Sequence, residues 1–205
     1  MVTMLNRREV IATLLRERRD LLVVSGLGSP TWDVAAAGDS DGNFYLWGAM
    51  GGAVMVGLGL ALAQPNRNVL VVTGDGEMLM GLGSLATVAH RNPPNLAIAV
   101  LDNGHYGETG MQPSHTAGRA RLQSVATACG IERVHDVEDG EHLQEFRAAM
   151  HERRGPLFAR IRIESRDELR VLPERDGVTL KSRMRRFLGV DGVGVLDHAP
   201  WGQSP

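Results

Sequence analysis

The sequence predicts an α/β protein in which a doubly wound, mainly parallel sheet carries helices on both faces. Two observations lead to this fold class. Apolar runs of strand length alternate with segments of helical apolar spacing, which is the order expected of repeated βα units. Two of these runs, VLVVT at 69–73 and LAIAVL at 96–101, are apolar on both faces, as central parallel strands are when helices cover each side of the sheet.

The expected elements alternate along the chain, although their periodicity does not determine the order of the strands in the sheet. Residues 1–19 mix charged and apolar side chains as an amphipathic helix does, and they lack the continuous apolar core of a secretory signal. Strands are expected at 21–24, 69–73, 96–102 and 157–163, with a less apolar one at 132–135. Helices are expected at 48–63, 78–90, 122–128, 141–153 and 178–188.

The length of 205 residues suits one domain, which we place at residues 1–189. Residues 190–205 show no periodicity and are expected to form an irregular tail. A net charge of -2 and the lack of a polybasic run give no reason to expect binding to nucleic acid or to a membrane surface. The single cysteine, Cys129, excludes an internal disulfide and a cysteine-ligated cluster, and it fits a cytoplasmic location.

A turn suited to a diphosphate follows the strand expected at 69–73. The strand leads into Gly74, Asp75, Gly76 and Glu77, and a helix is expected directly afterwards. In an open parallel sheet, ligands bind at the carboxyl ends of strands, where helix N-termini offer free N–H groups to phosphates. The glycines allow a close approach of the backbone, and the Asp75 carboxylate is suited to bridging through a divalent cation to phosphate oxygens.

A second polar turn follows the next long strand. Asn103 lies 28 positions after Asp75 and is followed by Gly104, His105, Tyr106 and Gly107. One βαβ unit takes roughly 30 residues, so the two turns are expected side by side. Magnesium prefers six oxygen ligands, and the side-chain oxygens of Asp75 and Asn103 with the carbonyl oxygen of His105 would supply three of them. Two diphosphate oxygens and a water would complete the shell.

With these two turns the chain resembles the diphosphate-binding domain of thiamine diphosphate enzymes, whose signature is GDG followed after some 25 to 30 residues by Asn-Asn or Asp-Asn. The resemblance implies thiamine diphosphate and Mg²⁺ as cofactors, with Tyr106 and Gly107 in the second cofactor loop. It also implies that Met50, 25 positions before Asp75, wedges the cofactor into a V shape, and that Gly48 accepts a hydrogen bond from its aminopyrimidine. A methionine at this position of a helical segment is otherwise a core residue.

The end of the first expected strand corresponds to the family's first cofactor loop. The resemblance therefore implies that Ser25, Gly28 and Ser29 contact the diphosphate or the pyrimidine. Serine and glycine are also ordinary turn residues at such a position.

The family also needs a second domain, which binds the pyrimidine and supplies a glutamate to its N1′ atom. We find no second α/β unit of adequate length in this sequence, and so we expect a separate α-type subunit to carry that glutamate, in a hetero-oligomer with at least two copies of each chain. Among split enzymes the chain is most similar to the sulfopyruvate and phosphonopyruvate decarboxylase group, because the loop GHYGETGMQPSHT resembles theirs. The implied function is the β subunit of a 2-oxo acid decarboxylase acting on a small anionic substrate.

Several points stay open at the level of the sequence. The polar loop residues are candidates to order over a bound anion, with His115 also a candidate proton donor, although a solvated connection explains them equally well; they are Glu108, Thr109, Gln112, His115 and Thr116. A thiamine-dependent carboligase of the acetolactate synthase type would share the same cofactor anchor. A non-catalytic diphosphate-binding module that regulates a partner is the alternative from a different class.

Overall fold

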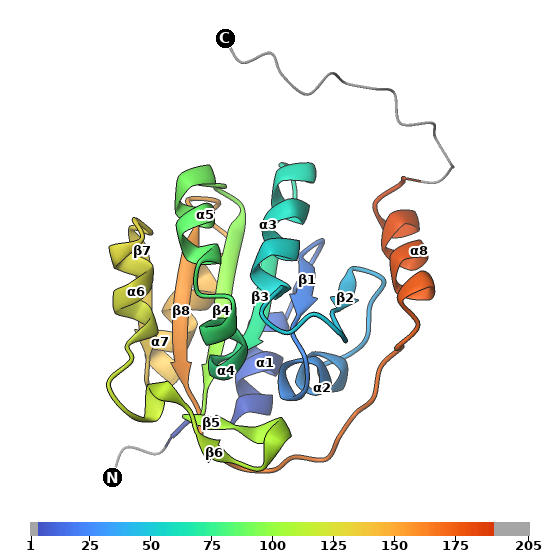
Figure 1. Ribbon diagram of the computed structural model, residues 1–205. Coiled ribbons are helices and arrows are strands. Elements are labelled where there is room, and N and C mark those ends of the chain that lie inside the picture. The colour runs from blue at the N-terminus through green and yellow to red at the C-terminus, as the bar shows by residue number, and fades with distance from the viewer. Residues whose placement is uncertain (1–3, 191–205) are drawn as a thin grey trace.

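The computed structural model describes residues 4–190 and shows the predicted doubly wound architecture. A six-stranded sheet has the order β2-β1-β3-β4-β8-β7, and every neighbouring pair in it is parallel (Figure 1). Its strands are β1 (Leu22–Ser25), β2 (Asn43–Tyr45), β3 (Val69–Gly74), β4 (Leu96–Asp102), β7 (Arg133–Val137) and β8 (Leu157–Arg162). The predicted adjacency of β3 and β4 is confirmed, with Gly74 opposite Leu101 at their carboxyl ends.

Helices cover both faces of the sheet, and alternate strand residues face the two layers. Residues such as Leu70 and Val72 pack against α1 (Arg7–Leu15), α2 (Ser29–Ala36) and α7 (Gly140–Ala149). Their neighbours, such as Val69 and Val71, pack in the second cluster. That layer contains α3 (Ala53–Ala63), α4 (Asp75–Met80), α5 (Ser84–Arg91) and α6 (Leu122–Ala128). The apolar runs thus bury both of their faces, as predicted for central parallel strands.

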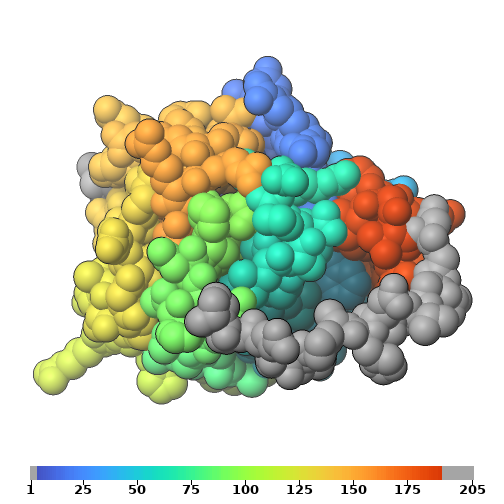
Figure 2. Space-filling model, turned by 90° about the horizontal axis from the view of Figure 1, so that it is seen from above, coloured from blue at the N-terminus to red at the C-terminus, as the bar shows by residue number. Residues whose placement is uncertain are grey.

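The last helix lies at one margin of the sheet. Helix α8 (Gly177–Phe187) packs beside β2, and Figure 2, seen from the end of the molecule opposite the carboxyl ends of the strands, shows it across the molecule from the region of α6. Residues 164–176 connect β8 to α8 by running past the carboxyl ends of the strands (Figure 1). The sequence predicts three arginines near the C-terminal end of α8, where cations are favourable: Arg183, Arg185 and Arg186. Arg185 and Arg186 lie in its last turn, whereas Arg183 lies before that turn and is buried.

Glycine explains how two of the predicted helices differ from the structure. The helix expected at 48–63 begins only at Ala53, because Gly51 has a φ of 90° and breaks the helical path. The helix expected at 78–90 is divided into α4 and α5 around residues 81–83. A Cβ atom on Gly81 would lie 2.2 Å from the carbonyl oxygen of Gly51, so the division lets two backbones meet.

Sequence periodicity did not indicate three further elements. These are α2, β2, and a two-stranded hairpin formed by β5 (His105–Tyr106) and β6 (Gln112–Pro113). The helix expected over residues 1–19 is confirmed only as Arg7–Leu15. The predicted tail lies outside the described residues from 191 onward. No helix among the described residues is long and apolar enough to span a membrane.

Candidate active site

A cavity of about 190 Å³ lies at the carboxyl ends of the strands, where both polar turns meet. Its wall contains the glycine-rich turn after β3 and the Asn103 turn after β4, together with parts of the first loop and of the loop before α3. The predicted cofactor-binding residues that line it are Ser29, Met50, Gly74, Asp75, Gly76, Glu77, Asn103, His105, Tyr106 and Gly107. Positions predicted from separate parts of the sequence therefore share one cavity.

The other predicted cofactor-binding residues and the candidate proton donor lie outside the cavity lining, whereas Glu108 and Thr109 of the polar loop belong to it. Ser25 is fully buried, with its hydroxyl 2.6 Å from that of Thr31 in α2. Gly28 has a φ of 77° and precedes α2, where only a glycine adopts that backbone easily. Gly48 is exposed in the loop before α3. His115, the candidate proton donor, is exposed and has its Nδ1 atom 2.9 Å from the Tyr106 hydroxyl.

Met50 does not occupy the hydrophobic core. Its side chain is 39% exposed and borders the cavity, on the loop that Gly51 turns out of the helix. The core interpretation of this methionine therefore finds no support in its surroundings, and its assignment as the wedge stays a prediction.

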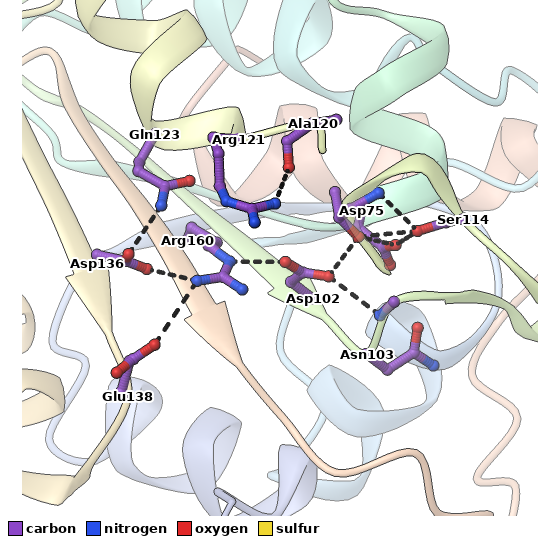
Figure 3. A network of polar contacts seen from close by, with 12 residues as sticks. Asp75, Asp102, Asn103, Ser114, Ala120, Arg121, Gln123, Asp136, Glu138 and Arg160 are labelled. Carbon is purple, nitrogen blue, oxygen red and sulfur yellow. Dashed lines mark hydrogen bonds and ion pairs between the residues drawn. The ribbon is translucent and has the colours of Figure 1, made fainter. Parts of the chain in front are cut away.

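Asp75 is 2% exposed and is held by two hydroxyl groups from a distant loop (Figure 3). Ser114 donates a hydrogen bond to Oδ2 of Asp75, and the Thr116 hydroxyl lies 2.9 Å from the same oxygen. Burial raises the pKa of Asp75, the charge of Asp102 raises it further, and the two hydroxyl contacts act in the opposite direction. A buried carboxylate in this position is stabilised by a cation that reaches it.

Asp102 anchors the same loop from the other side. The Thr116 hydroxyl lies 2.7 Å from its Oδ1 atom, and the Arg160 guanidinium binds its Oδ2 atom at 2.6 Å. The Nη1 atom of Arg160 also donates to Oδ1 of Asp136, in the edge strand β7, at 2.9 Å (Figure 3). Because a hydroxyl carries one hydrogen, Thr116 donates to one of the two carboxylates at a time, and Ser114 donates to Asp75. Thr116, one of the candidates to order over an anion, has its hydroxyl between Asp75 and Asp102.

Glu77 binds three segments together at the cavity wall. Its carboxylate accepts hydrogen bonds from the Thr73 hydroxyl at 2.8 Å and from the backbone N–H of Gly51 at 3.3 Å. Backbone N–H groups of Leu27 and Ala53 also bind it. Burial raises the pKa of Glu77, against the effect of these donors. The side chain thus holds the Met50 loop against the ends of β1 and β3.

The second turn is preorganised by its own backbone. The Asn103 side-chain oxygen accepts the backbone N–H of His105 at 2.9 Å, and the His105 ring nitrogen Nδ1 lies 2.8 Å from the Asn103 carbonyl oxygen. Gly76 lies so close to the Tyr106 ring that a Cβ atom would come within 2.6 Å of it. The two turns are therefore in direct contact, and glycine at position 76 is required for that approach.

The donor chemistry of the site suits magnesium only together with a ligand. Among residues 4–190, no group of three or more His, Cys, Asp or Glu side chains is arranged to hold a metal ion. The predicted set has one carboxylate, Asp75, and two neutral oxygens, from Asn103 and His105. Such a set leaves the charge of a divalent cation to be balanced by phosphate oxygens, which fits a cation that arrives with a diphosphate.

A family model supports the same assignment. Residues 35–161 match the family described as "Thiamine pyrophosphate enzyme, C-terminal TPP binding domain". The chain belongs to this thiamine pyrophosphate enzyme family. The match includes Met50, both polar turns and the Ser114–Thr116 loop.

Similar proteins define the group within the thiamine pyrophosphate enzyme family. The sulfopyruvate decarboxylase subunit beta of Methanothermobacter thermautotrophicus is 39% identical over 78% of this chain and 83% of its own length. The phosphonopyruvate decarboxylase of Streptomyces viridochromogenes is 43% identical over 71% of this chain, which spans 36% of that protein. These similarities place the chain among thiamine-dependent decarboxylases, as the sequence predicted.

A solved structure supports the fold. A thiamin diphosphate-dependent enzyme from Mycobacterium smegmatis superimposes with a TM-score of 0.68 at 22% identity, covering 79% of this chain and 32% of its own. At this level of identity the similarity concerns the fold alone.

Proposed function

We propose that this chain binds the diphosphate of thiamine diphosphate through Mg²⁺ and serves as the β-type subunit of a 2-oxo acid decarboxylase. The observation that carries the proposal is the meeting of the two polar turns at one cavity, with Asp75 and Asn103 both in its wall. The substrate class, a small anionic 2-oxo acid, is suggested by the names of the similar decarboxylases.

The chain's own residues hold and orient the cofactor in this proposal. When bound, thiamine diphosphate supplies the carbon nucleophile and the electron sink that decarboxylation requires. Asp75, Asn103 and the His105 carbonyl hold the metal end, and Gly74 and Gly76 leave room for the phosphates. Met50 supports the bent conformation from the cavity wall, and Glu77 fixes the loop that carries it.

A separate subunit supplies the pyrimidine side. The similar M. thermautotrophicus protein is named a subunit, and it is matched over most of its length. The three carboxylates of the cavity wall, Asp75, Glu77 and Glu108, lie beside the polar turns. Asp75 is assigned to the metal, and Glu77 is already engaged by its own donors, so that a glutamate facing N1′ is expected from the partner.

The test of the proposal compares the purified full chain with the same chain co-purified with an α-type pyrimidine-domain subunit. Both samples receive thiamine diphosphate and Mg²⁺, and carbon dioxide release is followed with sulfopyruvate, phosphonopyruvate and pyruvate. We expect turnover only with the partner, and calorimetric binding of thiamine diphosphate that requires Mg²⁺. Sustained turnover by the chain alone would refute the split arrangement, and Mg²⁺-independent binding would refute the metal anchor.

A further inference from the structure

One arginine from the first helix lies in the cavity wall, although neither polar turn includes it. Arg7 is the first residue of α1 and is only 5% exposed, yet it borders the cavity together with Gly74, Asp75 and Asn103. Helix α1 is placed there by a parallel bridge between Leu5 and Ile163, just beyond the carboxyl end of β8. Residues far apart in the sequence thus meet at the diphosphate end of the site.

The contacts of Arg7 occupy only part of its guanidinium. Its Nη1 atom donates to Asp33 at 2.6 Å and to the Ser29 carbonyl oxygen at 3.4 Å. Among the described residues, its Nε and Nη2 groups have no hydrogen-bond partner, and neither is a fully enclosed atom. A guanidinium held by one nitrogen at the wall of a cavity therefore keeps donors for a ligand.

The charge around Arg7 favours an anion. Asp33 is fully buried and is shared by two arginines, because Arg8 binds its other oxygen at 3.1 Å. Among the described residues, Asp33 is the only carboxylate that forms an ion pair with these two guanidinium groups, while the exposed Glu168, bound to Asn6, also interacts with both charges from farther away. Arg7 is also the only arginine or lysine among the described residues that line the cavity, whereas Asp75, Glu77 and Glu108 line it with carboxylates.

We propose that Arg7 binds the diphosphate group of the cofactor directly, as a phosphate ligand additional to the metal. This inference rests on the proposed function. A diphosphate ester and Asp75 together carry more negative charge than one Mg²⁺ neutralises, and a fixed guanidinium fork supplies the balance. The substrate is the less suitable anion for Arg7, since it reacts at the other end of the cofactor, beyond the phosphates.

The neighbouring arginine provides a matched control. Arg7→Met and Arg8→Met each remove one guanidinium from the buried Asp33, but only Arg7 borders the cavity. A purely structural role through Asp33 would affect both variants in the same way. The readout is calorimetric binding of thiamine diphosphate, of thiamine and of inorganic pyrophosphate, each with Mg²⁺, to the complex with the partner subunit. Thermal unfolding of each variant is measured alongside.

For Arg7→Met we expect Kd for thiamine diphosphate and for pyrophosphate to rise roughly 10- to 100-fold, the value of one charge-assisted hydrogen bond. The Kd of thiamine, which has no phosphate, should not change, and Arg8→Met should bind all three as the wild type does. If Arg7→Met does not fold, Arg7→Lys carries the test, because it keeps a cation beside Asp33 and loses the fork; a smaller rise in Kd is then expected.

Three results would overturn the inference. The first is an unchanged Kd for thiamine diphosphate in Arg7→Met or, if that variant does not fold, in Arg7→Lys. The second is an equal loss of affinity for thiamine diphosphate in Arg7→Met and Arg8→Met. The third is a raised KM for the 2-oxo acid in Arg7→Met with unchanged cofactor binding. Failure of the wild-type complex to bind thiamine diphosphate while it still binds Mg²⁺ and pyrophosphate would refute the proposed function alone. If the wild-type complex binds neither thiamine diphosphate nor pyrophosphate, the proposed function and the role of Arg7 are both refuted.

Discussion

Asp75 and Glu77 stand two residues apart in one turn, and both are buried carboxylates whose pKa burial raises. The hydrogen-bond donors around the two side chains differ. Glu77 is enclosed by a hydroxyl and by backbone N–H groups from three segments, so its charge is already satisfied within the chain. The described contacts of Asp75 are two hydroxyl groups at one oxygen and its own backbone N–H, beside the charge of Asp102. A carboxylate with several donors around it stabilises loops, whereas one left with few donors is available to a cation.

The largest difference between the two carboxylates is expected in the Asp75→Asn variant. Cofactor binding should weaken roughly 100-fold or more, because the only carboxylate in the metal shell becomes a neutral amide. The folded chain without ligand should not lose stability. A pKa that is raised in the folded state means that the wild type loses stability as the pH rises from about 4 through the folded pKa of Asp75.

The variant should therefore be the more stable of the two at neutral pH, with the difference vanishing in acid. Calorimetry with thiamine diphosphate and Mg²⁺ and thermal unfolding at pH 4 and pH 8 check both parts. Wild-type cofactor affinity, or a large loss of stability at pH 8, would show that Asp75 is a structural residue like Glu77.

Glu77→Ala should give the opposite pattern. Removing this carboxylate leaves the Thr73 hydroxyl and the Gly51 N–H without their acceptor, at a cost of about 1–3 kcal/mol in the free energy of unfolding. Cofactor affinity should fall less than in Asp75→Asn. Denaturant unfolding measures the first effect.

Gly26→Ala is the companion variant for Glu77→Ala. A Cβ atom at position 26 would lie 1.5 Å from Oε2 of Glu77 and would displace the carboxylate. It should therefore reproduce the destabilisation. A Glu77→Ala variant that unfolds like the wild type would contradict the bracing role.

The smallest effect on stability is expected from Met50→Ala, on the loop that Glu77 holds. Truncation of a buried methionine costs about 2–5 kcal/mol, and a side chain that is 39% exposed should cost well below that range. Turnover of the complex with its partner should fall all the same, because the bent conformation of the cofactor loses its support. The exposed Met55 in α3 offers a matched control, which should change neither quantity. Unchanged turnover in Met50→Ala would remove the wedge assignment.

Much of the fold and of the site could be predicted because the signals were local. A buried parallel strand needs a continuous apolar run. The runs VLVVT and LAIAVL predict β3 and β4 from their own residues, and no other part of the chain is needed for that prediction. The polar turns after them are equally local, and the length of one βα unit sets their separation. Asp75 and Asn103 therefore came together at one cavity as predicted.

The groups that surround Asp75 and Asn103 depend on tertiary packing and could not be predicted from the sequence. Ser114 donates a hydrogen bond to Asp75, 39 positions away in the sequence, and Arg160 binds Asp102, 58 positions away. Arg7 is held beside the cavity by an ion pair with Asp33. The division between α4 and α5 likewise depends on the approach of the Gly51 backbone. Periodicity reports how a segment buries its own apolar face, but it contains no information on which distant donor will meet a carboxylate. That depends on strand order and helix packing, and here it separates the carboxylate assigned to the metal from the one that braces the loops.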